Sequence, residues 1–173
     1  MQALYGLLAM ALVAILSLTV MRATRSTDNS ILVNEMATQA SGVGVDVLEA
    51  IGRLPFDSNT DTTKVFTFPA VTSADELTGE GSFGGCASFA DCEDIDDFDG
   101  LTVTRALDGF EYDVEIHVRY VSEDSPDVYS GGNTFAKEVR VQITNPYIFF
   151  GDPSNPLTIE MRRVFTYQRA TEA

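Results

Sequence analysis

The sequence predicts an α+β fold, in which a long N-terminal α-helix packs on an antiparallel β-sheet of about four to five strands. Three observations lead to this prediction. An apolar run opens the chain, apolar residues then recur every three or four positions as far as Pro55, and apolar and polar residues alternate beyond it. The helix is expected over residues 1–54, with an apolar segment at 1–21 and an amphipathic part at 30–54. The sheet domain is expected over residues 55–173.

Length and charge narrow the class of protein. At 173 residues, the chain has room for one ordinary domain and an appendage. It carries 11 basic and 26 acidic residues, which gives a net charge of −15. Binding to nucleic acid depends on Lys and Arg side chains that neutralise phosphates, so no nucleic-acid partner is expected. We interpret the negative charge as a solvated acidic surface.

Residues 1–21 contain no charged side chain. A helix of about 20 apolar residues is long enough to cross the core of a bilayer. Because this segment is apolar on nearly all sides, it has to be surrounded by lipid or by other helices. Together with the amphipathic part it predicts a helix roughly 80 Å long, at about 1.5 Å per residue.

The amphipathic part of the helix carries one apolar stripe, which is the expected cover for the dry face of the sheet. Pro55 ends the pattern, because a helix rarely continues through the residue before proline. Gly42 and Gly44 each weaken the helix by about 1 kcal/mol relative to Ala. They mark either a bend or a close packing contact, and both alternatives stay open. The stripe consists of Leu32, Met36, Ala40, Val43, Val47, Ile51 and Leu54.

Beyond Pro55, the apolar residues follow the period of two that is typical of strands in a sheet with one dry and one wet face. Asp108-Gly109 is a strong signal for a two-residue hairpin turn. The candidate strands are residues 64–71, 101–107, 110–121, 134–144 and 157–168. The proline-rich connection 145–156 carries four bulky residues in a row. They either fold back on the core or form an exposed subunit contact, and they are Tyr147, Ile148, Phe149 and Phe150.

Cys86 and Cys92 are the two cysteines of the chain and lie in a glycine-flanked loop. Their spacing is longer than that of most metal-binding cysteine pairs, and the one histidine of the chain is elsewhere. A disulfide that closes the loop is therefore predicted, and it implies an oxidising compartment.

Catalytic chemistry is not expected. His117 lies between Glu115 and Arg119 on the wet side of a strand, and no nucleophile motif such as G-x-S-x-G occurs in the chain. The sequence therefore predicts a protein that is not an enzyme.

The densest acidic cluster is CEDIDDFDG, and two interpretations of it remain open. Its aspartates cap the turns of a solvated loop, or they bind Ca²⁺, which prefers hard carboxylate oxygens. No other cofactor is expected. A second fragment, DSNTD at residues 57–61, has the D-x-N-x-D opening of a calcium loop, but Thr62 stands where glycine is required. The candidate calcium ligands are Asp94, Asp96, Asp97 and Asp99.

Three stretches together resemble the type IV pilins and pseudopilins: MQALYGLLAMALVAILSLTVMRA, EAIGRLPFD at the end of the helix, and CEDIDDFDG followed by the Asp108-Gly109 hairpin. The resemblance implies that a prepilin peptidase removes a basic leader before Met1 and that the new N-terminus is methylated. The helix then anchors the subunit in the inner membrane, until the pilus assembly machinery adds it to an extracellular filament of identical subunits.

The same resemblance assigns a filament-core role to the apolar segment. The residues concerned are Met1, Leu4, Tyr5, Leu7, Leu8, Met10, Leu12, Val13, Ile15, Leu16, Leu18 and Val20. The family usually has Phe at the first mature position and Glu at the fifth, where this chain has Met1 and Tyr5. Tyr5 supplies no carboxylate to pair with a neighbour's N-terminal amine. The alternatives are a low-copy minor pilin or pseudopilin, and a membrane-tethered binding module that does not polymerise and whose acidic loop binds Ca²⁺.

Overall fold

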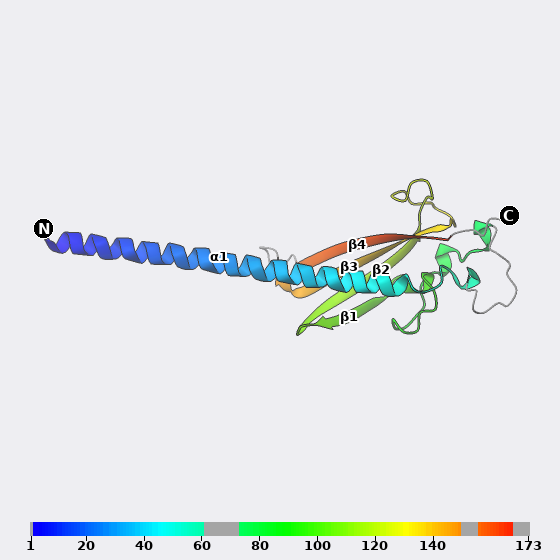
Figure 1. Ribbon diagram of the computed structural model, residues 1–173, viewed down its shortest axis with the longest axis horizontal. Helices are drawn as coiled ribbons and strands as arrows, with labels where there is room; N and C mark the ends of the chain where they lie inside the picture. Colours follow the sequence, from blue (N-terminus) through cyan, green and yellow to red (C-terminus); the bar gives the residue numbers. More distant parts are fainter. Residues whose placement is uncertain (1, 61–72, 150–155, 168–173) are drawn as a thin grey trace. The chain divides into compact units, whose positions relative to one another are not determined.

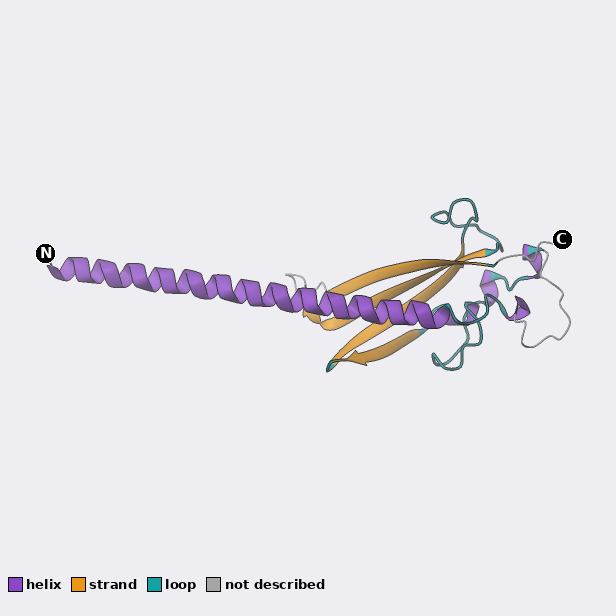
Figure 2. Cartoon of the chain, viewed as in Figure 1, coloured by secondary structure: helices purple, strands orange, loops and turns teal. Residues whose placement is uncertain are grey.

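A computed structural model describes residues 2–60, 73–149 and 156–167 (Figure 1). The helix and the strands in these ranges are α1 (Gln2–Ile51), β1 (Thr102–Leu107), β2 (Phe110–Tyr120), β3 (Ala136–Phe149) and β4 (Pro156–Thr166). Short 3-10 helices precede β1: η1 (Ser58–Thr60), η2 (Ala74–Glu76), η3 (Glu80–Ser82) and η4 (Asp96–Phe98). The predicted class is confirmed at this level, since the fold is α+β with a long helix and a four-stranded antiparallel sheet (Figure 2).

The chain divides into two compact units, Met1–Thr38 and Gln39–Ala173. The first unit consists of the N-terminal part of α1. The second contains the last turns of α1, the 3-10 helices and the sheet. We refer to them as the helix unit and the sheet unit.

The sheet has the strand order β1-β2-β3-β4, and each strand is antiparallel to its neighbour. The predicted hairpin is confirmed, because Leu107 pairs with Phe110 and only Asp108 and Gly109 lie between them. Both turn residues have positive φ angles, 50° and 85°, as a two-residue hairpin turn of this type requires. The candidate strand at 64–71 lies outside the described residues.

One prediction about the sheet was wrong. The connection expected from Asn145 onward begins later, because β3 continues as a strand to Phe149. The pairing of β3 with β4 is irregular between Asn145 and Phe149, so the period-two pattern is interrupted where the backbone still runs as a strand.

Alternation along β2 places its apolar side chains on one buried face. Tyr112, Val114, Ile116 and Tyr120 have no exposed surface and Val118 is 5% exposed, whereas the residues that alternate with them are exposed or half-buried. Phe110 follows the same alternation but is 37% exposed, because it stands at the hairpin end of the strand. The last turns of α1 lie along this face in the sheet unit (Figure 2).

The expected helix–sheet residues fall into two groups. Val43, Val47 and Ile51 are buried in the core of the sheet unit, and Leu54 is half-buried against it. Met36, in the helix unit, is 1% exposed. Leu32, one helical turn before Met36, was expected to be covered but is 46% exposed, so the buried stripe of the helix begins at Met36.

The two glycines of the amphipathic segment have different roles. A Cβ atom at Gly44 would lie 2.6 Å from Met161 Sδ and 2.9 Å from Ile143 Cδ1, whereas a Cβ at Gly42 would meet nothing within 4 Å. The sequence left open whether the glycines mark a bend or a close packing contact. Gly44 marks close packing, because the absent side chain lets the helix backbone approach β3 and β4.

Candidate functional site

The helix unit has an apolar surface. Eight large apolar side chains between residues 10 and 21 are each 55–74% exposed, and we call them the apolar helix surface: Met10, Leu12, Val13, Ile15, Leu16, Leu18, Val20 and Met21. Thr19 adds little polarity, because its hydroxyl donates a hydrogen bond to the Leu16 carbonyl at 2.8 Å. Met1 lies outside the described residues, as do the side chains of Leu4, Tyr5, Leu7 and Leu8. In the part of the chain that is described, no helix combines the length and the apolar character needed to cross a membrane.

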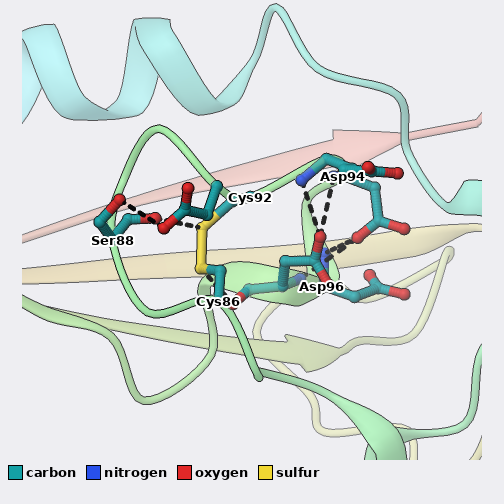
Figure 3. Close-up of a disulfide and its surroundings, with 8 residues drawn as sticks. Cys86, Ser88, Cys92, Asp94 and Asp96 are labelled. Carbon is teal, nitrogen blue, oxygen red and sulfur yellow. Dashed lines mark hydrogen bonds between the residues drawn. A yellow bond between two sulfur atoms is a disulfide. The ribbon is translucent and has the colours of Figure 1, made fainter.

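The predicted disulfide is confirmed, because Cys86 and Cys92 are bonded (Figure 3). Within the loop that it closes, Ser88 Oγ donates a hydrogen bond to Asp91 Oδ2 at 2.7 Å. Gly84 precedes the loop with a φ of 80°, and a Cβ there would lie 2.6 Å from the Asp99 carbonyl oxygen. Only glycine satisfies both the backbone angle and the space at this position.

Three of the four candidate calcium ligands accept hydrogen bonds from backbone N–H groups. Asp94 Oδ1 accepts from the N–H groups of Asp96 and Asp97 at 3.0 and 3.2 Å (Figure 3). Asp97 Oδ2 accepts from Glu93 at 2.8 Å, and Asp99 Oδ1 from Val118 at 2.8 Å. The contacts of Asp94 and Asp97 are local and correspond to the turn-capping interpretation, whereas Asp99 binds the backbone of β2. Among the described residues, no three His, Cys, Asp or Glu side chains are grouped so that they could hold a metal ion.

Asp96 has a different partner, a lysine with no exposed surface. Lys137 Nζ contacts Asp96 Oδ1, donates a hydrogen bond to the Phe56 carbonyl at 2.8 Å, and lies 3.5 Å from Asp57 Oδ2. Asp57 is fully buried, and Asp96 is 3% exposed. We call Lys137, Asp57 and Asp96, with the aromatic rings around them, the Lys137 centre.

Three aromatic rings surround the ammonium group. Lys137 Nζ lies 4.2 Å from the centroid of the Phe56 ring, 5.1 Å from that of Tyr120 and 5.4 Å from that of Phe83. The Tyr120 hydroxyl does not donate a hydrogen bond to this centre, because it donates one to the Thr78 carbonyl at 2.7 Å. The rings exclude water from the amine while offering it weak cation–π attraction.

Four parts of the fold bring this centre together. Lys137 lies on β3 opposite Tyr120 of β2, and both face the core. Asp57 follows the end of α1, Asp96 is the first residue of η4, and Phe83 follows η3. All of these residues belong to the sheet unit.

The two carboxyl groups of the centre titrate differently. Burial raises the pKa of Asp57, but hydrogen bonds from the Asn59 and Thr78 N–H groups and the charge of Lys137 outweigh it, so the pKa lies below its usual value. For Asp96, burial is the largest effect and raises the pKa to about 8, although the charge and hydrogen bond of Lys137 act in the opposite direction. At neutral pH, Asp57 is therefore ionised, and Asp96 is mostly protonated.

Comparison with protein-family models, curated proteins and solved structures found no match.

Sequence reasoning did not identify Lys137, although a signal was present. Lys137 is separated by two, four and six residues from Val139, Val141 and Ile143, so the period of two in the sequence places it on the same dry face as these apolar side chains. A lysine at an inward position of a strand has to find a buried partner. The partners lie 80 and 41 residues away in the sequence, so the signal gives the burial of Lys137 but not the centre.

The remaining candidate residues are peripheral. Phe149 is 40% exposed, whereas the side chains of Tyr147 and Ile148, and all of Phe150, lie outside what is described. His117 Nε2 lies 3.2 Å from Glu115 Oε1 on the outer face of β2, and both side chains are half exposed. This surface pair has no nucleophile beside it among the described contacts.

Proposed function

We propose that the chain is a structural subunit of an extracellular, type IV pilus-like filament, and that it polymerises through the apolar helix surface. One observation carries the proposal: the eight large apolar side chains of this surface are all more than half exposed in the single chain. Exposed apolar areas of this extent belong to interaction sites. They are favourable to bury, at roughly 25 cal/mol per Å² removed from water.

The surface surrounds the helix, which suits a bundle better than a single docking partner. Val13 and Leu16, three residues apart, lie on one side of the helix, and Leu18 lies on the opposite side, so covering all of them takes several neighbouring helices. Each subunit then meets the next head-to-tail, and a heterologous contact that does not close into a ring produces a helical filament. The sheet units would face outward, with their acidic side chains in water.

The proposal includes the steps before assembly that the family resemblance implies. A prepilin peptidase cuts a basic leader before Met1, the inner membrane holds the apolar segment, and the assembly machinery transfers the subunit to the filament. The disulfide supports the extracellular destination, because such bonds persist in oxidising compartments.

The test is a pair of matched charge substitutions. Leu16→Glu places a charge on the apolar helix surface, at a side chain that is 62% exposed. Val128→Glu places the same charge on a loop of the sheet unit, at a side chain that is 55% exposed. We expect Leu16→Glu to abolish filaments in cell-surface shear fractions, viewed by negative-stain microscopy, while Val128→Glu retains them.

Two results would contradict the proposal. Filaments of normal abundance from Leu16→Glu would show that the apolar surface is not the assembly core. Extraction of the wild-type chain as a monomer in mild detergent, with no filament in the shear fraction, would favour the membrane-tethered binding module. Mass spectrometry of the same fraction would identify the mature N-terminus and test the expected cleavage before Met1.

A low-copy minor subunit is the second candidate, and Tyr5 favours it. A subunit without the family's carboxylate at this position lacks a group that pairs with a neighbour's N-terminal amine during repeated addition. In purified filaments a major subunit dominates the protein stain, whereas a minor subunit is barely visible, so the stain separates the two.

A further inference from the structure

The Lys137 centre holds an amine against a carboxyl group in the absence of water. Lys137 has no exposed surface, and its Nζ contacts Asp96 Oδ1. The hydrogen bond from Nζ to the Phe56 carbonyl at 2.8 Å fixes the position of the amine. Among the described atoms, Asp96 Oδ2 is buried without a hydrogen-bond partner. One oxygen of the carboxyl group therefore contacts the amine, and the other is held by no hydrogen bond.

A buried ion pair with this composition is a costly way to stabilise a fold. Removing an ammonium and two carboxyl groups from water costs several kcal/mol per charged group, and the attraction between them often fails to repay that cost. Apolar side chains of similar size would fill the same space between Phe56, Phe83 and Tyr120. The arrangement instead has the parts of a reaction: an amine, a carboxyl group and a second carboxylate within 3.5 Å of the amine.

We propose that Lys137 and Asp96 condense into an intramolecular isopeptide bond between Lys137 Nζ and Asp96 Cγ, and that Asp57 transfers the protons. The inference is independent of filament formation, because every participant belongs to the sheet unit of one chain.

The reaction is a dehydration that needs no oxidant, cofactor or co-reactant. Asp57 takes one proton from the Lys137 ammonium, and the nitrogen lone pair then attacks Cγ of the protonated Asp96. In the tetrahedral intermediate, Asp57 gives its proton to the Oδ2 hydroxyl. The Cγ–Oδ2 bond breaks, and its electron pair leaves with the departing water. Asp57 finally takes a second proton from the nitrogen. The products are one amide, one water and a protonated Asp57, with no change in net charge.

Before the bond forms, the protonation states of Asp96 and Asp57 favour these reaction steps. Burial raises the pKa of Asp96, so the group that is attacked is the uncharged acid, which is the electrophilic form. Hydrogen bonds from the Asn59 and Thr78 N–H groups, at 2.9 and 2.7 Å, keep Asp57 ionised despite its burial, so it can accept a proton. Carboxyl groups with such opposed pKa values are suited to acid and base roles.

The proximity of the two groups and the exclusion of water favour formation of the amide. Groups held in contact by a folded protein react as if at very high concentration, with effective molarities up to about 10⁵–10⁸ M. The three aromatic rings exclude the water that would otherwise hydrolyse the product. Asp96 also lines a solvent-open hollow of about 330 Å³, which gives the released water a way out.

The bond would join two distant parts of the sheet unit. Lys137 lies on β3, and Asp96 lies on η4, 41 residues earlier. The η4 segment follows the Cys86–Cys92 loop, so a covalent bond at Asp96 would tie that loop to the middle of the sheet. A subunit pulled along a filament would then resist unfolding at this point.

Mass spectrometry of the full-length protein tests the proposal. Trypsin cuts after Lys and Arg, so the reduced, unbonded chain gives peptide 65–105, with Asp96, and peptide 120–137, which ends at Lys137. In the bonded chain, trypsin cannot cut at the modified Lys137. We expect a branched product of 65–105 joined to 120–140, lighter by one water than the sum of its two parts.

Matched variants identify the roles of the residues. Lys137→Met lacks the amine and should give unbranched peptides 65–105 and 120–140, because trypsin does not cut after the new Met. Asp57→Asn lacks the proton acceptor and should give the linear peptides 65–105 and 120–137, with no loss of water from the mass of the chain. Glu138→Gln is the control, because Glu138 is the next residue and is also buried but faces arginines outside the centre. It should form the branched peptide as the wild type does.

The wild-type protein alone can overturn the proposal. If folded, full-length wild-type chain gives only linear peptides 65–105 and 120–137 after prolonged incubation, no bond forms. A branched peptide in Asp57→Asn, in the same yield as the wild type, would remove Asp57 from the mechanism. Circular dichroism of each variant shows whether a missing bond reflects a lost fold.

Discussion

Single residues carry the least expected chemistry of this molecule. Lys137 is fully buried among three aromatic rings, with carboxyl groups from two other segments beside it. Nearby on the same strand, the buried Glu138 is paired with Arg119 at 2.9 Å and Arg140 at 3.2 Å. Neighbouring positions of β3 therefore place opposite charges on opposite faces of the sheet. Glu138 is paired with arginines that are partly exposed to solvent, whereas the partners of Lys137 are themselves buried.

The raised pKa of Asp96 predicts an unusual pH dependence in a variant that cannot form the bond. In Lys137→Met, the charge and hydrogen bond that lower this pKa are gone, so it lies at or above the value of about 8 in the unsubstituted centre. The folded state then binds a proton that the unfolded state, in which Asp96 has the ordinary aspartate pKa of 3.8, releases. The free energy of unfolding should fall as the pH rises from 5 to 7, by about 1.4 kcal/mol per pH unit at most.

Denaturant titrations at several pH values measure this dependence. The double variant Lys137→Met/Asp96→Asn is the control. Its free energy of unfolding should not fall in this way as the pH rises, because the side-chain amide at position 96 does not titrate. Asp57 and Asp94, the other carboxyl groups near Asp96, are present in both proteins, so their contributions cancel. Equal slopes in the two proteins would show that Asp96 is ionised when folded.

At the scale of elements, α1 meets the sheet through a missing side chain. Gly44 is buried where Met161 and Ile143 approach the helix backbone, whereas Gly42 is exposed. Substitution of either glycine by alanine should gain about 1 kcal/mol of helix stability. At Gly44 alone, the new methyl group also has to displace its neighbours, which costs about 1–3 kcal/mol in packed cores.

The two alanine variants therefore form an internally controlled comparison. We expect Gly42→Ala to be more stable than Gly44→Ala by about 1–3 kcal/mol in urea unfolding of the full-length chain. The gain in helix stability from replacing glycine by alanine is the same in both variants and cancels in the comparison. Equal stabilities would show that Met161 moves aside without cost and that the contact is not tight.

Features that depend on residues close together in the sequence could be predicted from it, whereas features that depend on residues far apart could not. The Asp108-Gly109 turn depends on adjacent residues, and the buried face of β2 on a local alternation, so both were predictable. The role of Gly44 depends on β3 and β4, far along the chain, and the sequence left two explanations open. The Lys137 centre needed three distant segments to be placed together, which no local pattern can do.

At the scale of the whole molecule, charge would oppose the proposed filament assembly. Each chain has a net charge of −15, and a filament brings many such chains together. Salt screens this repulsion, with a Debye length of about 10 Å at 0.1 M. We therefore expect the temperature at which purified filaments dissociate to rise with sodium chloride concentration, and to fall when a chelator removes divalent cations.

A charge-reduced variant separates this effect from the general action of salt on apolar contacts. Glu111→Gln/Glu115→Gln neutralises two exposed side chains on the outer face of β2 and should weaken the salt dependence. Light scattering during heating measures the dissociation. Filaments that dissociate at one temperature regardless of salt and chelator would show that the acidic surfaces do not face one another closely enough to interact.

The narrow space above Gly44 also makes one side chain sensitive to oxidants. A Cβ at residue 44 would lie only 2.6 Å from Met161 Sδ, so the sulfur has little free space on the side of the helix. Conversion to the sulfoxide adds a polar oxygen to that sulfur. The oxygen would have to push the helix from the sheet or turn the side chain outward, so oxidation of Met161 by peroxide would loosen the contact between α1 and β4 at Gly44.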